Sequence, residues 1–252
     1  MKIFLFAKRN TKEILRDPIN LFFGLGFPLI LLFLFSVINT AIPAEANNTM
    51  FSIDNTAPGI ATFGTAFFAL FSGMLLAKDR TTSFLMRLFA SPMTALDFIF
   101  GYTLPLLVMA TVQGSITFLA AALLGLPLSV NTLLAVLVVL PIAILFIGLG
   151  LLCGSFLNDK AVGGICGALL TNVAGWFSGV WIPLDLIGGV FKQIAEALPF
   201  YHSVEAAKQT ISGNFTGIMP HLAVVLGYAV VFYAFAVIAF RHKMRGNEHL
   251  VW

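Results

Sequence analysis

The chain has 252 residues, of which 59% are hydrophobic and 10% are charged, and 26 of them are phenylalanine. A soluble domain of this length needs a charged surface that this composition does not supply, so the sequence predicts an integral membrane protein. The formal net charge of +3 gives no indication of a nucleic-acid partner. The positions of the charges along the chain are more informative than their sum.

Basic and apolar side chains alternate irregularly over residues 1–20. This pattern is typical of an amphipathic helix that lies in the membrane interface, with its Lys and Arg side chains among lipid phosphates. The alternative is a plain positive flank of the first membrane span.

Six long apolar runs follow, each close to the ~20 residues that cross a ~30 Å hydrocarbon core. The short connections leave no room for a soluble domain, so we expect one transmembrane domain over residues 1–252. The predicted fold is an all-α integral membrane protein with six transmembrane helices. The runs cover residues 21–42, 59–77, 98–124, 132–157, 161–182 and 221–240.

The basic residues lie almost entirely on one side of these six runs. Twelve of the fourteen Lys and Arg residues belong to the two ends of the chain, to the segment 78–97 and to the turn at 158–160. The two others, Lys192 and Lys208, lie in the interval 183–220. The positive-inside rule therefore predicts a protein of the cell membrane with both termini and the segment 78–97 in the cytoplasm.

The segment 78–97 is the longest charged interval between apolar runs in the first two-thirds of the chain. Its apolar residues, such as Phe84 and Leu88, are spaced as on one face of a helix. The pattern predicts a short amphipathic helix at the membrane surface that faces something in the cytoplasm. The alternative is that its charges only anchor the loop at the lipid headgroups.

The external interval 183–220 is neither a short turn nor a hydrophilic domain. Apolar residues recur at helical spacing between Pro183 and Pro199, and a second amphipathic piece follows Ser203. Two such pieces predict a re-entrant helical hairpin before the last span, dipping into the outer leaflet against protein. A pair of helices lying flat on the membrane is the alternative.

The fifth run carries a ladder of small residues at intervals of four. Small side chains at this spacing form a groove in which another helix can approach closely. Packing within the chain and contact with a second copy explain this ladder equally well. Its members are Gly163, Gly167, Thr171, Gly175 and Gly179.

Polar residues within or next to the apolar runs are sparse, and most are expected to form hydrogen bonds between helices. As a set with one tryptophan, six of them also suit the lining of a mostly apolar pathway for an amphiphilic cargo. These candidates are Asn39, Ser72, Gln113, Thr117, Asn172 and Trp176.

The sequence contains no motif for nucleotide binding or catalysis. It has neither a G-x-x-x-x-G-K-[ST] run nor an H-E-x-x-H run, and no histidine is placed to activate a nucleophile at membrane depth. The six runs also contain no Asp, Glu, Lys or Arg, whereas proton-coupled carriers usually keep a carboxylate in the membrane. We therefore expect no enzymatic activity, cofactor or metal in this chain.

The layout of the chain resembles the membrane permease subunit of type-2 ABC exporters over nearly its whole length. Four pieces carry the resemblance through their order and spacing. They are Arg16-Asp17-Pro18, Ala57-Pro58-Gly59, the run Arg87-Leu88-Phe89-Ala90-Ser91-Pro92, and Ser178-Gly179-Val180-Trp181-Ile182-Pro183 followed by Leu198-Pro199-Phe200.

The resemblance implies a partner that supplies energy. In the family, two permeases pair, here as a homodimer or with a related chain, and each docks on a separate ATP-binding subunit that carries ATP and Mg²⁺. The segment from Thr81 to Ser91 would be the coupling helix. Met86 stands where the family often has Glu, which departs from its pattern. The implied contacts to the ATP-binding subunit are Arg80, Thr81, Thr82, Arg87, Ser91 and Asp97.

The resemblance also assigns the first and fifth spans to the dimer contact and the central pathway. An external gate would be formed by Pro183, Phe191, Pro199 and Phe200. The resulting hypothesis is an ATP-driven export permease for a drug, lipid or peptide. An ATP-independent channel or secondary transporter is the alternative.

Overall fold

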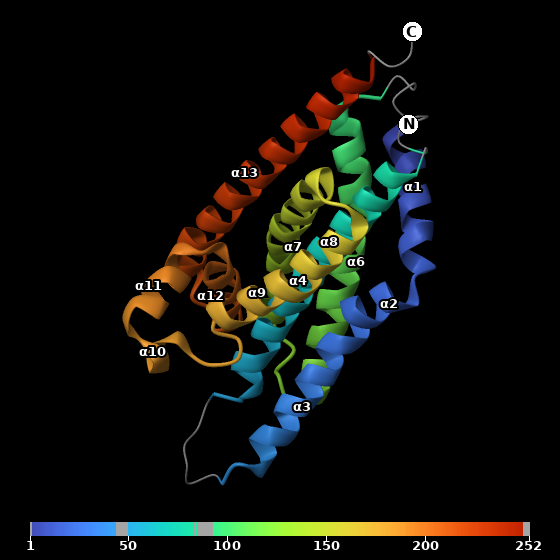
Figure 1. Ribbon diagram of the computed structural model, residues 1–252. Helices are drawn as coiled ribbons and strands as arrows, with labels where there is room; N and C mark the ends of the chain where they lie inside the picture. Colours follow the sequence, from blue (N-terminus) through green and yellow to red (C-terminus); the bar gives the residue numbers. More distant parts are fainter. Residues whose placement is uncertain (1, 44–49, 83, 85–92, 249–252) are drawn as a thin grey trace.

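The computed structural model describes residues 2–43, 50–82, 84 and 93–248, with side chains as far as residue 242. Every regular element within these residues is helical, which confirms the all-α prediction. Helix α1 (Lys2–Leu15) begins, and helix α13 (Phe215–Glu248) ends, at the same end of an elongated bundle (Figure 1). We call this the termini end of the bundle and the opposite one the far end.

Five helical stretches in the described part of the chain are long and apolar enough to cross a membrane. They fall on the first, second, third, fourth and sixth of the predicted runs. The first stretch joins α2 (Pro18–Leu21), a π-helical segment η1 (Phe22–Gly26) and α3 (Phe27–Ala41), and the others are α4 (Ile53–Thr81), α6 (Ala95–Leu123), α7 (Val130–Phe156) and α13.

The fifth predicted run is helical but irregular. It consists of α8 (Asp159–Val162), a π-helical segment η3 (Gly163–Leu170) and α9 (Thr171–Phe177). The junction residues Val162 and Thr171 keep right-handed helical dihedral angles, so the path is continuous. At ~1.5 Å per residue it is roughly 28 Å long, close to the thickness of a hydrocarbon core. Six crossings are thus compatible with the structure and place both ends of the chain on one side.

Helix α4 forms the centre of the bundle. In the most apolar part of α4, 83% of the residues are buried. The corresponding shares are 22% in α13 and 17% in the first membrane-spanning stretch, residues 18–41. Glycines explain the tight fit against α7, because a Cβ atom at Gly150 or Gly154 would overlap the backbone of α4 around Ala69 and Gly73. This close approach is the packing mode of small residues in membrane helices.

Capping boxes fix where α6 and α7 begin. The side chain of Thr94 accepts a hydrogen bond from the backbone N–H of Asp97, whose carboxylate accepts one from the Thr94 backbone. Ser129 and Thr132 form the same reciprocal pair at the start of α7. Each box satisfies two backbone donors that the first helical turn would otherwise leave unpaired.

The interval 183–220 folds into three helices and the first turns of α13. Helices α11 (Gly189–Ala197) and α12 (Pro199–Ile211) follow the short α10 (Leu184–Ile187), and they meet at Leu198 as the two arms of a helical hairpin. Helix α12 packs on α4, α7 and α13, whereas most of α11 is exposed. The two predicted amphipathic pieces are therefore present as helices, and their depth in a membrane stays a prediction.

Candidate functional site

Helix α4 continues beyond Ala77, where the second apolar run was expected to end, and reaches Thr81. This extension carries Asp79 and Arg80 into the bundle at the termini end. Asp79 has only 2% of its surface exposed. A buried carboxylate is costly unless it is paired and hydrogen-bonded, so its partners define the site.

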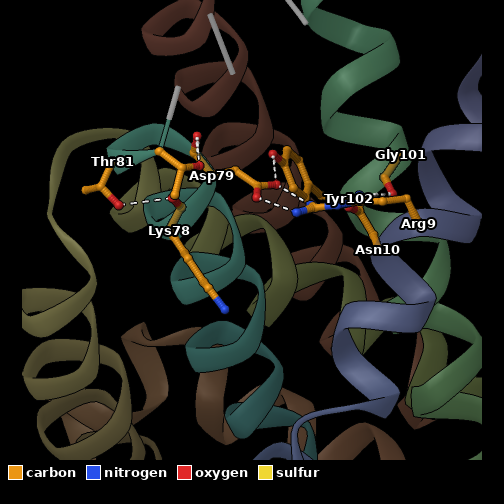
Figure 2. A network of polar contacts seen from close by, with 8 residues as sticks. Arg9, Asn10, Lys78, Asp79, Thr81, Gly101 and Tyr102 are labelled. Carbon is orange, nitrogen blue, oxygen red and sulfur yellow. Dashed lines mark hydrogen bonds and ion pairs between the residues drawn. The ribbon is translucent and has the colours of Figure 1, made fainter. Parts of the chain in front are cut away.

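Arg9 of α1 is the charged partner of Asp79. Its two terminal nitrogens lie 2.5 and 2.8 Å from the two carboxylate oxygens of Asp79. The hydroxyl of Tyr102 in α6 donates a third hydrogen bond of 2.9 Å to the same carboxylate. Figure 2 shows that the three side chains come from three different helices and converge on one point. The carboxylate is thereby neutralised and well supplied with donors.

The ion pair also acts on the protonation of Arg9. Burial alone would lower the pKa of the Arg9 guanidinium, but its hydrogen bonds to Asp79 and the nearby negative charge raise that pKa above its ordinary value. Arg9 therefore stays charged, as a bidentate contact to a carboxylate requires.

Aromatic and amide contacts hold α1 against α6 beside this ion pair. The Asn10 side chain donates a 2.9 Å hydrogen bond to the carbonyl of Gly101, which Figure 2 also draws. The ring of Phe6 packs edge-on against Phe98 and Tyr102, with ring centroids 5.6 and 4.9 Å apart. A side chain at Gly101 would clash with Phe6, so glycine is needed for this close approach.

Arg9 also contacts the segment 78–97. Its guanidinium carbon lies 4.3 Å from the centroid of the Phe84 ring, within the range of a cation–π interaction. One side chain thus joins α1, the end of α4 and the beginning of the predicted coupling helix. Two predicted partner contacts in this segment, Arg87 and Ser91, lie outside the described residues.

Arg80 occupies a different place from Arg9. It donates hydrogen bonds of 2.6 and 3.1 Å to the carbonyls of Gly154 and Leu157, where α7 ends and the turn to α8 begins. The last carbonyls of a helix have no partner in the helix itself, and a cation there also matches the helix dipole. Arg80 therefore ties the end of α4 to the end of α7.

The other predicted partner contacts at this end are more exposed. Thr81 and Thr82 lie on the surface, with their hydroxyls bonded to the carbonyls of Lys78 and Asp79. Asp97 is engaged in the cap of α6 with Thr94. The role of each residue in binding a partner stays a prediction.

The ion pair between Arg9 and Asp79 was not predicted from the sequence, and it corrects one expectation. We expected the basic side chains of residues 1–20 to lie among lipid phosphates, but the partly exposed Arg9 is paired with Asp79 of α4. The physical reason is that the buried carboxylate of Asp79 needs a cation. The sequence shows only that Arg9 is basic and that Asp79 is acidic. The two residues are 70 positions apart, so nothing in the sequence indicates that they pair.

The ladder of small residues is divided between two environments. Gly167 faces Leu70 of α4, and Gly175 lies against Trp181, so both allow close packing within the chain. The Thr171 hydroxyl bonds to the carbonyl of Gly167, and Gly179 adopts a φ of +75°, which favours glycine. Gly163 faces open space.

The predicted pathway residues also separate into two groups. Ser72 donates a 3.1 Å hydrogen bond to the Ile147 carbonyl, and Gln113 donates 3.3 Å hydrogen bonds to the Ala61 carbonyl and the Thr117 hydroxyl. Those three side chains are buried between helices. Asn39 is partly exposed, while Asn172 and Trp176 lie on the surface. A role in lining a pathway stays a prediction for all six.

The predicted gate residues lie at or near the hairpin. Phe200 is buried and stacks on Phe146, while Phe191 stacks on Phe177 with ring centroids 4.5 Å apart. Pro183 precedes α10, and Pro199 opens α12. These contacts seat the hairpin against α7 and α9, and its gating role stays a prediction.

Comparison with known proteins gives one family match. A family model described as ABC-2 type transporter matches residues 1–212 of the chain. No curated protein matches the chain.

Proposed function

Because the chain belongs to the ABC-2 type transporter family and is a membrane permease, we propose that it exports an amphiphilic cargo from the cytoplasm. A drug, a lipid or a hydrophobic peptide would suit its uncharged, phenylalanine-rich spans. ATP would be hydrolysed on a separate subunit, and the permease would alternate between inward-facing and outward-facing states.

The observation that carries this proposal is the junction formed by Arg9. A partner that pushes on the segment 78–97 acts next to Phe84, and Phe84 contacts the Arg9 guanidinium. Arg9 is fixed by two hydrogen bonds to Asp79 in α4, the most buried long helix of the described chain. Movement of the segment would therefore reach the centre of the bundle through a short, rigid connection.

The distribution of charge supports the orientation of the chain in the membrane. The ends of the chain and the segment 78–97 hold most of the Lys and Arg residues, so we place the termini end in the cytoplasm. An ATP-binding subunit in the cytoplasm would then meet the end of α4 that carries Asp79 and Arg80.

Exposed apolar side chains support pairing with a second permease, which we take to be a copy of this chain. Phe33 and Val37 of α3 are 63% and 47% exposed, and Leu169 and Trp176 of the fifth helical path are 61% and 49% exposed. Figure 1 shows both elements alongside α4 on one side of the bundle. Two ATP-binding subunits would serve such a pair.

The test is purification of the full chain from native membranes in mild detergent, followed by an ATPase assay of the complex. We expect a stoichiometric ATPase whose activity depends on the permease. The substitution Asp79→Asn should leave the ATPase bound but remove this dependence, because Arg9 loses its anchor. The matched control is Asp185→Asn, which removes an exposed ion pair at α10. A chain that purifies alone and conducts solutes without ATP would instead establish a channel.

A further inference from the structure

A groove with a volume of about 680 Å³ runs along the outside of the bundle between α6 and α13. Its walls include Leu96, Phe100 and Leu107 of α6 and Val230 and Ile238 of α13, and Ile144 of α7 also lines it. Val230 and Ile238 are 68% and 61% exposed, so the groove is open toward the surrounding membrane.

The length of the groove corresponds to one leaflet. From Leu96 to Leu107 the α6 wall measures roughly 17 Å at ~1.5 Å per residue, about half of a ~30 Å hydrocarbon core. Helix α6 begins at the termini end. The groove therefore lies in the half of the membrane on that side, whichever direction transport takes.

The groove offers no free hydrogen-bond donor among its described side chains. Its two hydroxyl groups, on Thr103 and Tyr233, lie 3.0 Å apart, and Thr103 donates to the carbonyl of Ile99. Tyr233 then donates to Thr103, so both hydroxyl protons are used within the protein. An occupant of this groove must be apolar along its length.

A cation stands at the mouth of the groove at the termini end. Arg241 is exposed and lies one helical turn beyond Val237 and Ile238, on the same stripe of α13. Lys243 and Arg245 follow in the sequence. The acidic residue in the first turn of α6, Asp97, already accepts hydrogen bonds from Thr94.

We propose that this groove binds one acyl chain of an anionic phospholipid, whose phosphate pairs with Arg241. The apolar walls match the chain, their length matches one leaflet, and the guanidinium matches a phosphate. A transmembrane helix of another protein would find only half of its length covered by this groove. The site is separate from the ion pair of Asp79 and does not depend on the cargo.

The test uses the purified full chain in mild detergent with equimolar phosphatidylglycerol and phosphatidylcholine that carry identical acyl chains. Native mass spectrometry then counts the lipid of each kind that the protein retains. We expect a preference of about fivefold for phosphatidylglycerol, because both lipids carry a phosphate but the choline cation of phosphatidylcholine offsets that charge and repels Arg241. Arg241→Gln should abolish the preference, while the matched control Lys12→Gln, an exposed cation of α1, should keep it.

A second pair of variants tests the acyl chain. Ala234→Phe places a ring in the groove and should lower retention of both lipids, whereas Ala223→Phe on an exposed part of the same helix should not. Val230→Trp serves as a second groove-filling variant in case Ala234→Phe fails to fold. Equal retention of the two lipids, or equal losses in Arg241→Gln and Lys12→Gln, would overturn the headgroup assignment. Unchanged lipid retention in both groove-filling variants would overturn the assignment of an acyl chain to the groove.

Discussion

Two ion pairs of nearly equal length lie in different parts of the molecule. Arg9 and Asp79 approach to 2.5 Å at the termini end, and Lys192 and Asp185 approach to 2.6 Å at α10 and α11. The side chains of the two cations are similarly exposed, at 32% and 35%, but the carboxylates differ, at 3% for Asp79 and 83% for Asp185. The two pairs therefore differ in the burial of the carboxylate and not in the distance between the charged atoms.

This difference decides what each pair contributes. A buried carboxylate that loses its cation has no water to replace it, so breaking such a pair is strongly destabilising. An exposed pair exchanges its partner for water at little cost and is screened by salt. The buried pair is also joined by Tyr102 and Phe84, whereas Lys192 reaches a second anion, Glu196, at 3.6 Å.

The largest effect is expected for Arg9→Gln. The variant leaves the buried Asp79 carboxylate without its cation, and we expect a loss on the order of 3 kcal/mol. For a chain of this size the melting temperature should fall by roughly 6–12 °C, measured by fluorescence-detected size exclusion after heating. The double variant Arg9→Gln with Asp79→Asn should recover part of the loss. A melting temperature within ~1 °C of the original chain would contradict the assignment of this pair.

A smaller effect is expected for Tyr102→Phe. The ring keeps its packing on Phe6, and only the hydrogen bond to the Asp79 carboxylate is lost, which should cost about 1.5–2 kcal/mol. In the Asp79→Asn background the same change should cost much less, because the charged acceptor is already absent. A double-mutant cycle by thermal melting measures this coupling, and simple additivity would show that Tyr102 does not act through Asp79.

A local effect of about 1 kcal/mol is expected for Arg80→Gln, since the variant removes a charged cap from the end of α7. Amide hydrogen exchange should become faster around residues 154–160, where the two accepting carbonyls lie. Exchange in α1 should stay unchanged, because Arg9 and not Arg80 holds that helix. A uniform acceleration over the whole chain would instead indicate global destabilisation.

The sequence alone predicted much of the fold, because composition and apolar run length determine a membrane helix. It placed the end of the second run at Ala77, since Lys78, Asp79 and Arg80 were taken as the start of a loop. The structure continues α4 through these residues because Arg9 neutralises Asp79 from a distant part of the chain. No periodicity reveals such a pairing, since helices α1 and α4 are brought together only by the tertiary fold.

The irregular fifth path shows a second limit of sequence reasoning. The sequence predicted a ladder of small residues that includes Gly163 and Gly167, but the π-helical geometry of Gly163–Leu170 was not foreseen. A wider helical turn changes which side chains share a face, so the ladder at intervals of four does not form one stripe. Gly163 faces open space, Gly167 faces Leu70 and Gly175 lies against Trp181.

The smallest effect is expected for Asp185→Asn, which sets the lower end of the comparison. A hydrogen bond from Lys192 and its positive charge lower the pKa of the Asp185 carboxylate, and the same contact raises the pKa of Lys192. A depressed carboxylate pKa adds stability above the ordinary pKa of the group, and this stability disappears as the pH falls through the lowered value.

Because Asp185 is exposed, that contribution is screened, and the melting temperatures of the variant and the original chain should agree within ~1 °C at pH 7 and in high salt. Any small difference between the two melting temperatures should vanish in acid, where the protonated carboxylate of the original chain is uncharged, like the amide of the variant. A loss at pH 7 as large as that of Arg9→Gln would mean that charge holds the hairpin of α11 and α12 in place. Burial of the carboxylate would then no longer distinguish the two ends of the molecule.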